Sequence, residues 1–225
     1  MNGGTPRANG GSARASGGPA HASGVVLAGG RSMRFGRNKL AEPMADGRTI
    51  LAHAVAAVAH VCRDVVVVIA PDAPVPAGLP ADARVVVDPE SFGGPLVGLA
   101  AGLARVSDDV VVVAGGDMPD LVPSVLARLA QVLVDGSAGA VRLADRDQAA
   151  ALPCAVRREP ALRAAESALA AGDRRLRGLF ERLVVELVPE GDWRVLDPDA
   201  RTLRDIDRPE DLLAEAVRPN DEYGD

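Results

Sequence analysis

The sequence predicts an α/β protein built on a doubly wound, mostly parallel sheet. Short, unbroken runs rich in Val recur along the first half of the chain, and segments with helical apolar spacing lie between and after them. Continuous apolar runs of this length suit strands that are buried on both faces, as in a parallel sheet. The alternation of the two patterns indicates an open sheet covered by helices.

The first half of the chain supplies most of the regular elements. Four strands are predicted at residues 24–28, 65–69, 84–87 and 110–114. Three helices are predicted at residues 50–61, 96–106 and 123–134. In the first helix Ala54, Val55, Val58 and Val61 fall on one stripe, which is typical of a helix that packs on a sheet.

The second half is less regular. A strand is predicted at residues 149–156, followed by helices at 160–171 and 174–182. Residues 183–188 alternate weakly between apolar and polar side chains. A closing helix is predicted at residues 209–217, because Pro209 suits a first helical turn and Asp207 lies close to a capping position.

Composition indicates one domain with a tail at each end. Residues 1–22 are rich in Gly, Ala, Ser and Asn and have no hydrophobic periodicity, which predicts a disordered N-terminal tail. Residues 218–225 are predicted to form a flexible C-terminal tail. The 225 residues, 48% of them hydrophobic, suffice for one sizeable core. The domain is therefore predicted at residues 23–217.

Charge and cysteine content exclude several classes of protein. The net charge of -6 disfavours binding to the phosphate backbone of a nucleic acid. No apolar run reaches the roughly 20 residues that are needed to span a bilayer. Two cysteines are too few for a disulfide framework. We therefore expect a cytoplasmic protein with no nucleic-acid or membrane partner.

The most informative motif is Leu-Ala-Gly-Gly-Arg-Ser-Met-Arg-Phe-Gly-Arg-Asn-Lys at residues 27–39. It begins at the carboxyl end of the first predicted strand, where open α/β sheets generally place ligands. Gly29 and Gly30 let the backbone approach a phosphate closely. Arg34 can donate two parallel hydrogen bonds to phosphate oxygens, while Lys39 supplies a compact charge. The alternative is a Gly-rich turn followed by a solvated basic loop.

Acidic residues follow other predicted strands. Asp117 comes shortly after the strand at 110–114, where a carboxylate is well placed to hold Mg²⁺ beside a triphosphate. The alternative is a turn residue that caps the next helix. Asp88 follows the strand at 84–87 and leads into Gly-Gly-Pro, which is either a plain turn or a ligand-binding segment. Asp205 and Asp207, if they lie on a strand, point the same way and can converge on one metal, or they cap the last helix.

These motifs together resemble the nucleoside-triphosphate transferases of the molybdenum cofactor guanylyltransferase type. The likeness rests on residues 27–39, Gly-Pro-Leu at 94–96, Gly-Asp-Met-Pro at 116–119 and residues 204–212, and it extends from about residue 24 to residue 217. It implies a Rossmann-like nucleotidyltransferase fold. It also implies transfer of GMP from GTP to molybdenum-loaded molybdopterin, with release of pyrophosphate.

The resemblance also implies roles for individual residues. The nucleotide would be bound by Leu27, Ala28, Gly29, Gly30, Lys39, Asp88 and Asp117. The catalytic residues would be Arg34, Lys39 and Asp117. Mg²⁺ would be the cofactor, held by Asp117 and Asp207, with Asp205 as an alternative ligand. The expected partners are GTP and molybdopterin, with molybdoenzymes or their chaperones as candidate recipients of the product.

Two other classes of function remain open from the sequence. One is a different nucleotidyltransferase on the same scaffold, using CTP or a sugar-phosphate or phospholactate acceptor. The other is a non-catalytic nucleotide-binding module. In the second half of the chain Arg174, Arg175 and Arg177 either bind the phosphate of the acceptor or lie on a solvated helix face.

Overall fold

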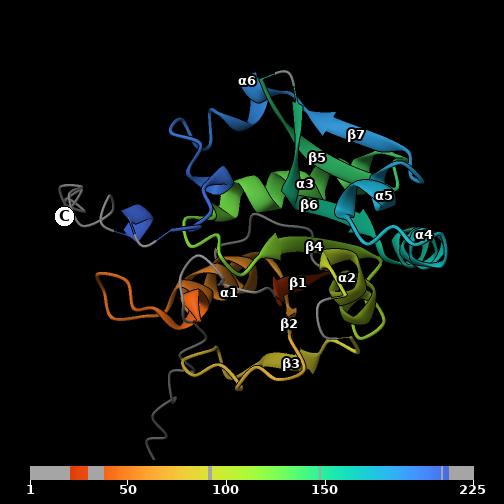
Figure 1. Cartoon of the computed structure of the whole chain (residues 1–225). Helices are drawn as coiled ribbons and strands as arrows, with labels where there is room; N and C mark the ends of the chain where they lie inside the picture. The colour runs from red at the N-terminus through yellow and green to blue at the C-terminus, as the bar shows by residue number, and fades with distance from the viewer. Residues whose placement is uncertain (1–20, 30–37, 91–92, 147, 209, 213–225) are drawn as a thin grey trace, which may run out of the picture.

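The computed structural model describes residues 21–29, 38–90, 93–146, 148–208 and 210–212. Within these residues seven strands form one sheet in the order β3-β2-β1-β4-β6-β5-β7 (Figure 1). The strands are β1 (Ala22–Ala28), β2 (Asp64–Ile69), β3 (Ala83–Val87), β4 (Val110–Gly115), β5 (Ala140–Asp145), β6 (Gln148–Arg157) and β7 (Val185–Val188).

The sheet is mostly parallel, as predicted. β1 pairs in parallel with β2 and β4, and β2 with β3. β6 is antiparallel to both β4 and β5, while β7 is parallel to β5. The four parallel strands β1–β4 therefore end at a common edge, and the antiparallel β6 separates them from the outer pair.

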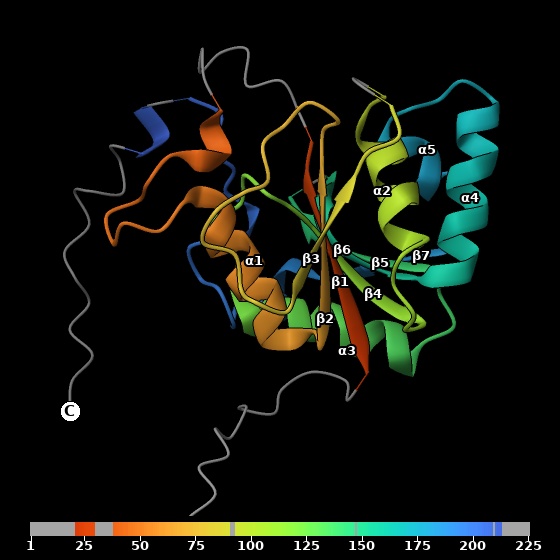
Figure 2. The same cartoon turned by 90° about the horizontal axis from the view of Figure 1, so that it is seen from below.

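Helices cover both faces of the sheet (Figure 2). α1 (Ile50–Val61) and α3 (Pro123–Asp135) pack on one face, in a cluster with Val26, Val67 and Val112. α2 (Pro95–Leu103), α4 (Arg158–Ala170) and α5 (Leu176–Phe180) pack on the other face, with Val25, Val66 and Val111. Successive valines of one strand thus serve opposite faces, which explains why the strands read as unbroken apolar runs. In the part of the chain that the structure describes, no helix is long and apolar enough to cross a membrane.

The predicted elements of the first half are confirmed, and their ends move by a few residues. α2 ends at Leu103 rather than at residue 106, and β1 begins at Ala22, whose side chain is buried. In the second half the helix predicted at 174–182 is shorter, because α5 has only five residues. The closing helix predicted at 209–217 lies largely outside the described residues. Only 210–212 of this range are described, and they are helical.

The sequence pattern does not predict β5, because a charged residue interrupts its apolar run. That residue, Arg142, donates hydrogen bonds to the carbonyl oxygens of Ala149 and Ala150 on β6. Its guanidinium carbon also lies 4.2 Å from the centroid of the Phe180 ring. The hydrogen-bond donors of Arg142 are therefore engaged by the backbone of the neighbouring strand.

The chain returns to the centre of the sheet after β7. Two short helices follow, α6 (Glu190–Trp193) and the 3-10 helix η2 (Arg201–Leu203). The buried Asp197 accepts hydrogen bonds from the backbone N–H groups of Arg201 and Thr202, at 3.0 and 2.7 Å. The Thr202 hydroxyl accepts one from the N–H of Val122, at 3.1 Å. These bonds place residues 201–207 beside the connection between β4 and α3.

The strand on which Asp205 and Asp207 would point the same way does not form within the described residues, so that one of the two alternatives is wrong. Residues 204–207 have no ladder partner. Instead the N–H of Ile206 donates to the Asp117 carbonyl oxygen, and the Ile206 carbonyl accepts from the Lys39 ammonium group. The backbone groups that a strand would use in a ladder are therefore used in contacts with two predicted site residues.

Close packing of α2 on the sheet predicts the effect of one substitution. A Cβ at Gly102 would lie 2.6 Å from Val25 Cγ1 and 3.1 Å from Val68 Cγ2. We expect Gly102→Ala to lower the free energy of unfolding by about 1–3 kcal/mol, because an overfilled interface must shift to admit the methyl group. Denaturant unfolding measures the change.

Gly191→Ala, in α6, is the matched control. A Cβ at Gly191 meets no atom within 4 Å, so this variant should be as stable as the wild type or slightly more stable. Equal free energies of unfolding for the Gly102→Ala variant and the wild type would contradict the close packing of α2 on β1 and β2.

Candidate functional site

The carboxyl ends of β1 and β4 meet at one point of the sheet edge. Leu27 is in register with Gly115, and the N–H of Gly116 donates to the Leu27 carbonyl oxygen at 2.9 Å. Residues 27–29 of the Gly-rich motif belong to the described structure, as do Asn38 and Lys39. The predicted site residues Gly30 and Arg34 lie outside it.

Asp117 is held close to the end of β4. A Cβ at Gly115 would lie 2.6 Å from Asp117 Oδ1, so glycine is needed there for the carboxylate to fold back over the strand. The carbonyl oxygen of Asp117 is also engaged, since it accepts from the N–H of Ile206 at 2.9 Å. The Gly-Gly-Asp sequence therefore fixes both the side chain and the backbone of Asp117 at the sheet edge.

Lys39 joins the two predicted metal ligands. It opens the 3-10 helix η1 (Lys39–Ala41), which Asn38 caps by accepting from the N–H of Leu40. Lys39 Nζ donates to Asp117 Oδ2 at 2.9 Å, to the Ile206 carbonyl oxygen at 2.7 Å and to Asp207 Oδ1 at 3.1 Å. These three acceptors match the three N–H donors of an ammonium group.

The charges of this cluster shift the pKa values of two of its members. Burial lowers the pKa of Lys39, but hydrogen bonds and attraction to Asp117 and Asp207 outweigh burial, so the pKa is raised overall. Partial desolvation raises the pKa of Asp205, and the neighbouring charges of Asp207 and Asp117 raise it further. Lys39 therefore stays protonated at neutral pH, and Asp205 is the carboxyl group whose ionisation the site disfavours.

A small apolar cluster anchors the segment that carries Asp207. Ile206 is fully buried and packs with Met44 and Ile50, which belong to the connection after η1 and to the start of α1. Burying such a side chain contributes about 1.5–3 kcal/mol. The alternating Asp-Ile-Asp sequence thus places an anchor between two carboxylates.

Asp88 lies apart from this cluster. Its N–H donates to the Ile69 carbonyl oxygen, and its Oδ1 accepts from the N–H of Glu90. Its other carboxylate oxygen faces α2, 3.3 Å from where a Cβ of Gly98 would be. Asp88 is largely buried, and desolvation raises its pKa. Among the predicted nucleotide-binding residues, Asp88 therefore occupies the α2 side of the edge.

The three arginines considered for the acceptor phosphate are each engaged in an ion pair. Arg174 pairs with Glu90, Arg175 with Asp173, and Arg177 with Glu181. The backbone of Arg174 has a second role, because its carbonyl oxygen accepts from the N–H of Leu96 at the start of α2. These contacts favour the alternative of a solvated surface for all three arginines, of which only Arg177 lies in a helix.

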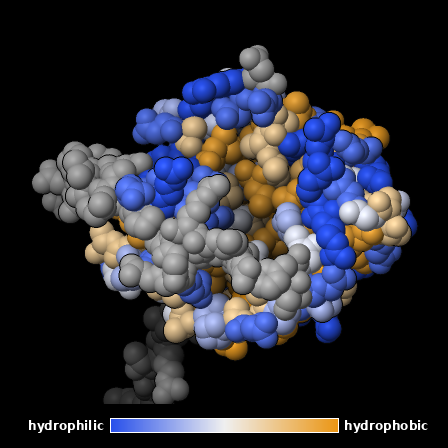
Figure 3. Space-filling view, viewed as in Figure 1, coloured by the Kyte–Doolittle hydropathy of each residue, from blue (hydrophilic) through white to orange (hydrophobic). Residues whose placement is uncertain are grey.

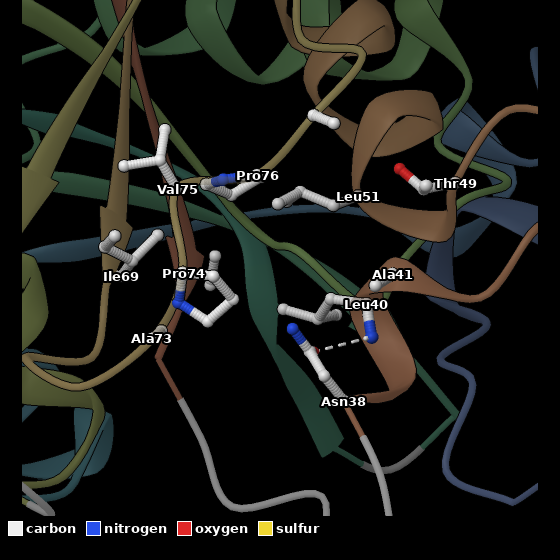
Figure 4. A pocket seen from close by; sticks show the side chains of 12 residues that line it. Asn38, Leu40, Ala41, Thr49, Leu51, Ile69, Ala73, Pro74, Val75 and Pro76 are labelled. Atoms are coloured by element: carbon white, nitrogen blue, oxygen red, sulfur yellow. Dashed lines mark hydrogen bonds between the residues drawn. The ribbon is translucent and has the colours of Figure 1, made fainter.

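A pocket of about 210 Å³, which no sequence pattern predicted, lies on the α1 side of the edge. Its lining includes Asn38, Thr49 and Leu51 on one side and Ile69 and the Pro-rich stretch 73–77 on the other (Figure 4). On the face seen in Figure 3, apolar residues lie in a central hollow between hydrophilic margins. The prolines in 73–77 are the only sequence signal that sets this stretch apart, and they mark a loop without indicating a pocket.

One further signal was available in the composition. Lys39 is the only lysine of the chain, so 24 of the 25 basic residues are arginines. A compact ammonium group with three donors occurs only where three acceptors converge, and a planar guanidinium does not fit that geometry. The two cysteines, by contrast, are buried thiols, and burial raises the pKa of each to about 12.

The chain is similar to known proteins over most of its length. A sequence model of the MobA-like NTP transferase domain matches residues 24–187. A protein of Chloroflexus aggregans named probable molybdenum cofactor guanylyltransferase is 36% identical over 192 residues, which cover 84% of this chain and 90% of that protein.

Two solved structures share the fold. Molybdopterin-guanine dinucleotide biosynthesis protein A from Archaeoglobus fulgidus has a TM-score of 0.71 at 22% identity, covering 86% of this chain and 96% of the other. The 2-C-methyl-D-erythritol 4-phosphate cytidylyltransferase from Thermus thermophilus has a TM-score of 0.62 at 21% identity, with coverages of 87% and 96%. From the match of the domain and the identity to the Chloroflexus protein, the chain belongs to the MobA-like NTP transferase family.

Proposed function

We propose that this chain transfers GMP from GTP to molybdenum-loaded molybdopterin and releases pyrophosphate. Family membership supports nucleotidyl transfer, and the relative that is 36% identical carries the name of a guanylyltransferase. The observation that carries the proposal is the Lys39 ammonium group, held by Asp117 and Asp207 at the edge where β1 and β4 end. The ammonium group would attract the negatively charged triphosphate, and the two carboxylates would bind the metal ion that accompanies it.

The donor set suits Mg²⁺. Asp117 and Asp207 both reach Lys39 Nζ, so their carboxylate oxygens lie around a single cationic point. Within the described residues no three acidic, His or Cys side chains form a group that could hold a metal. Mg²⁺ is usually bound by one or two carboxylates together with substrate phosphates and water. We therefore assign Mg²⁺ to Asp117 and Asp207, where it would offset the charge of the phosphates.

The proposed reaction is an in-line displacement at phosphorus. A terminal phosphate oxygen of molybdopterin attacks the α-phosphorus of GTP, the bond to the bridging oxygen of the β-phosphate breaks, and pyrophosphate leaves with that electron pair. Such a reaction depends on positioning and on stabilisation of negative charge. Lys39 would supply positive charge to the phosphates, and Arg34 a second cation.

The backbone just after β1 leaves room for a close approach of the phosphates. A Cβ at Gly29 would meet its nearest protein atom, the backbone nitrogen of Ala70, at an ordinary contact distance of 3.7 Å. Packing within the described residues therefore does not require glycine at this position. Approach of a phosphate to the backbone supplies a reason for it. Leu27, Ala28 and Gly30 would complete this part of the nucleotide site, with Asp88 on the α2 side.

The second candidate is a related transferase that uses CTP or a sugar-phosphate or phospholactate acceptor. The fold that this chain shares with the Thermus cytidylyltransferase supports keeping this candidate. We place the reaction in the cytoplasm, consistent with two buried, unpaired thiols, and expect molybdoenzymes or their chaperones to receive the product.

Substitution of the two charged residues tests the proposal. We expect Lys39→Ala and Asp117→Ala each to reduce turnover by at least about 100-fold, a typical cost of removing a main charge-stabilising group. The turnover of Lys39→Arg should be little higher than that of Lys39→Ala, because a guanidinium cannot reproduce three converging hydrogen bonds. Steady-state assays of pyrophosphate release measure the effect. Arg163→Ala, on the exposed face of α4, is the control, and near-wild-type turnover of a site variant would remove that residue from the mechanism.

The nucleotide and the metal are tested in the same assay. Pyrophosphate release is measured with GTP and with CTP, each with molybdenum-loaded molybdopterin, with and without Mg²⁺. We expect Mg²⁺-dependent turnover with GTP. A preference for CTP would assign the chain to cytidylyl transfer, and tight GTP binding without turnover would indicate a binding module.

Asp205 and Asp207 should respond differently to neutralisation. Asp207→Asn should reduce turnover most strongly at limiting Mg²⁺.

Asp205→Asn should instead increase the free energy of unfolding at neutral pH. The pKa of Asp205 is raised in the folded state, so its ionised form destabilises the fold. Below the ordinary pKa of 3.8 the carboxyl is neutral in both states, and the advantage of the Asn variant should vanish there. Denaturant unfolding between pH 3 and pH 8 measures this, with the exposed Asp199→Asn as control, and an advantage that does not depend on pH would contradict it.

A further inference from the structure

The two carboxylates that reach Lys39 lie on different segments, and neither segment belongs to a strand at that point. Asp117 lies in the connection from β4 to α3, and Asp207 lies after η2. The distance between them therefore depends on whatever ties these two connections together. The Ile206–Asp117 hydrogen bond is one tie. Side chains from both connections supply others.

Arg204 spans the two connections. One of its terminal nitrogens, Nη1, donates to Asp120 Oδ2 at 2.7 Å, and the other, Nη2, donates to the carbonyl oxygen of Asp211. Asp120 lies three residues after Asp117, and Arg204 lies three residues before Asp207. The Arg204 and Asp120 side chains are only 19% and 14% exposed, so water screens this pair less than a surface ion pair.

Asp211 fixes the backbone on the other side of Asp207. Its Oδ2 accepts from the N–H of Asp207 at 2.9 Å and from the N–H of Arg208 at 2.8 Å. The hydrogen bond from Arg208 in particular holds the pKa of Asp211 below its ordinary value, so the carboxylate is ionised at neutral pH. Asp211 thus holds the backbone of Asp207, and Arg204 links Asp211 to Asp120.

From these contacts we propose that Arg204, Asp120 and Asp211 form a positioning clamp, which sets the separation of Asp117 and Asp207 around Lys39. None of the three touches Lys39 in the described hydrogen-bond network, so they act through the residues that do. The catalytic consequence of this inference rests on the proposed function. The placement of Asp117 and Asp207 around Lys39 does not, and it can be tested without a substrate.

The catalytic consequence is tested with Arg204→Ala and with the milder Asp120→Asn, which keeps the shape of the side chain. A displacement of about 1 Å can cost about 100-fold in rate, so we expect kcat to fall about ten- to 100-fold. The KM for GTP should stay within about threefold. None of the clamp residues is assigned to nucleotide binding, so their loss should weaken stabilisation of the transition state more than binding of GTP. The double variant Arg204→Ala/Asp120→Asn should be no slower than Arg204→Ala alone, because Arg204→Ala already breaks the contact with Asp120.

The geometric part is tested without substrate. Since Lys39 is the only lysine, the protein grown on lysine labelled with ¹³C at the ε-carbon alone gives a single ε-carbon NMR signal. In Arg204→Ala and Asp120→Asn we expect the signal of the Lys39 ε-group to shift from its wild-type position, whereas Arg163→Ala should leave it unchanged. Circular dichroism confirms that each variant is folded.

The outcomes separate the two proposals. A shifted Lys39 signal in a chain whose wild type turns over neither GTP nor CTP would support the clamp and reject the proposed function. A wild-type Lys39 signal in both folded clamp variants would overturn the clamp, whatever the substrate is. Loss of thermal stability with unchanged kcat would also overturn it, since it would leave these residues a structural role only.

Discussion

The ammonium group of Lys39 joins three segments that are distant in the sequence. Asp117 is 78 residues away and Ile206 is 167 residues away, yet both accept a hydrogen bond from the same nitrogen. The Lys39 side chain is only 15% exposed, and its acceptors offset the cost of removing its charge partly from water. Conversely, Asp117 and Asp207 repel each other unless a cation lies between them. The site therefore assembles as a unit.

The sheet provides the rigid part of this unit, and the connections provide the rest. β1 and β4 are central strands, and the Gly116–Leu27 hydrogen bond extends their pairing beyond the end of the ladder. This fixes Asp117 relative to the start of the Gly-rich motif. Asp207 has no such support from a strand, and depends on the burial of Ile206 and on side-chain contacts. One carboxylate is thus placed by secondary structure and the other by tertiary contacts.

This difference explains how much of the molecule could be predicted. Unbroken Val runs predict the parallel strands, and the rule that their carboxyl ends share an edge predicts that Lys39 and Asp117 lie near each other. The Asp-Ile-Asp pattern marks Asp207 as a candidate metal ligand, but the strand that would align it with Asp205 does not form. Arg204 and Asp120 are not predictable as partners, because their contact depends on the path of a segment with no periodicity. The pocket beside Thr49 depends in the same way on a Pro-rich loop.

The distance along the chain between Lys39 and Ile206 has a consequence for synthesis. During translation β1, η1 and β4 emerge long before residue 206, and for that interval Asp117 and Lys39 lack the segment that completes their contacts. Domains generally fold as units as they emerge. A nascent chain that has its central strands therefore still lacks part of the hydrogen-bond acceptors of Lys39. These contacts are completed only when the last part of the domain leaves the ribosome.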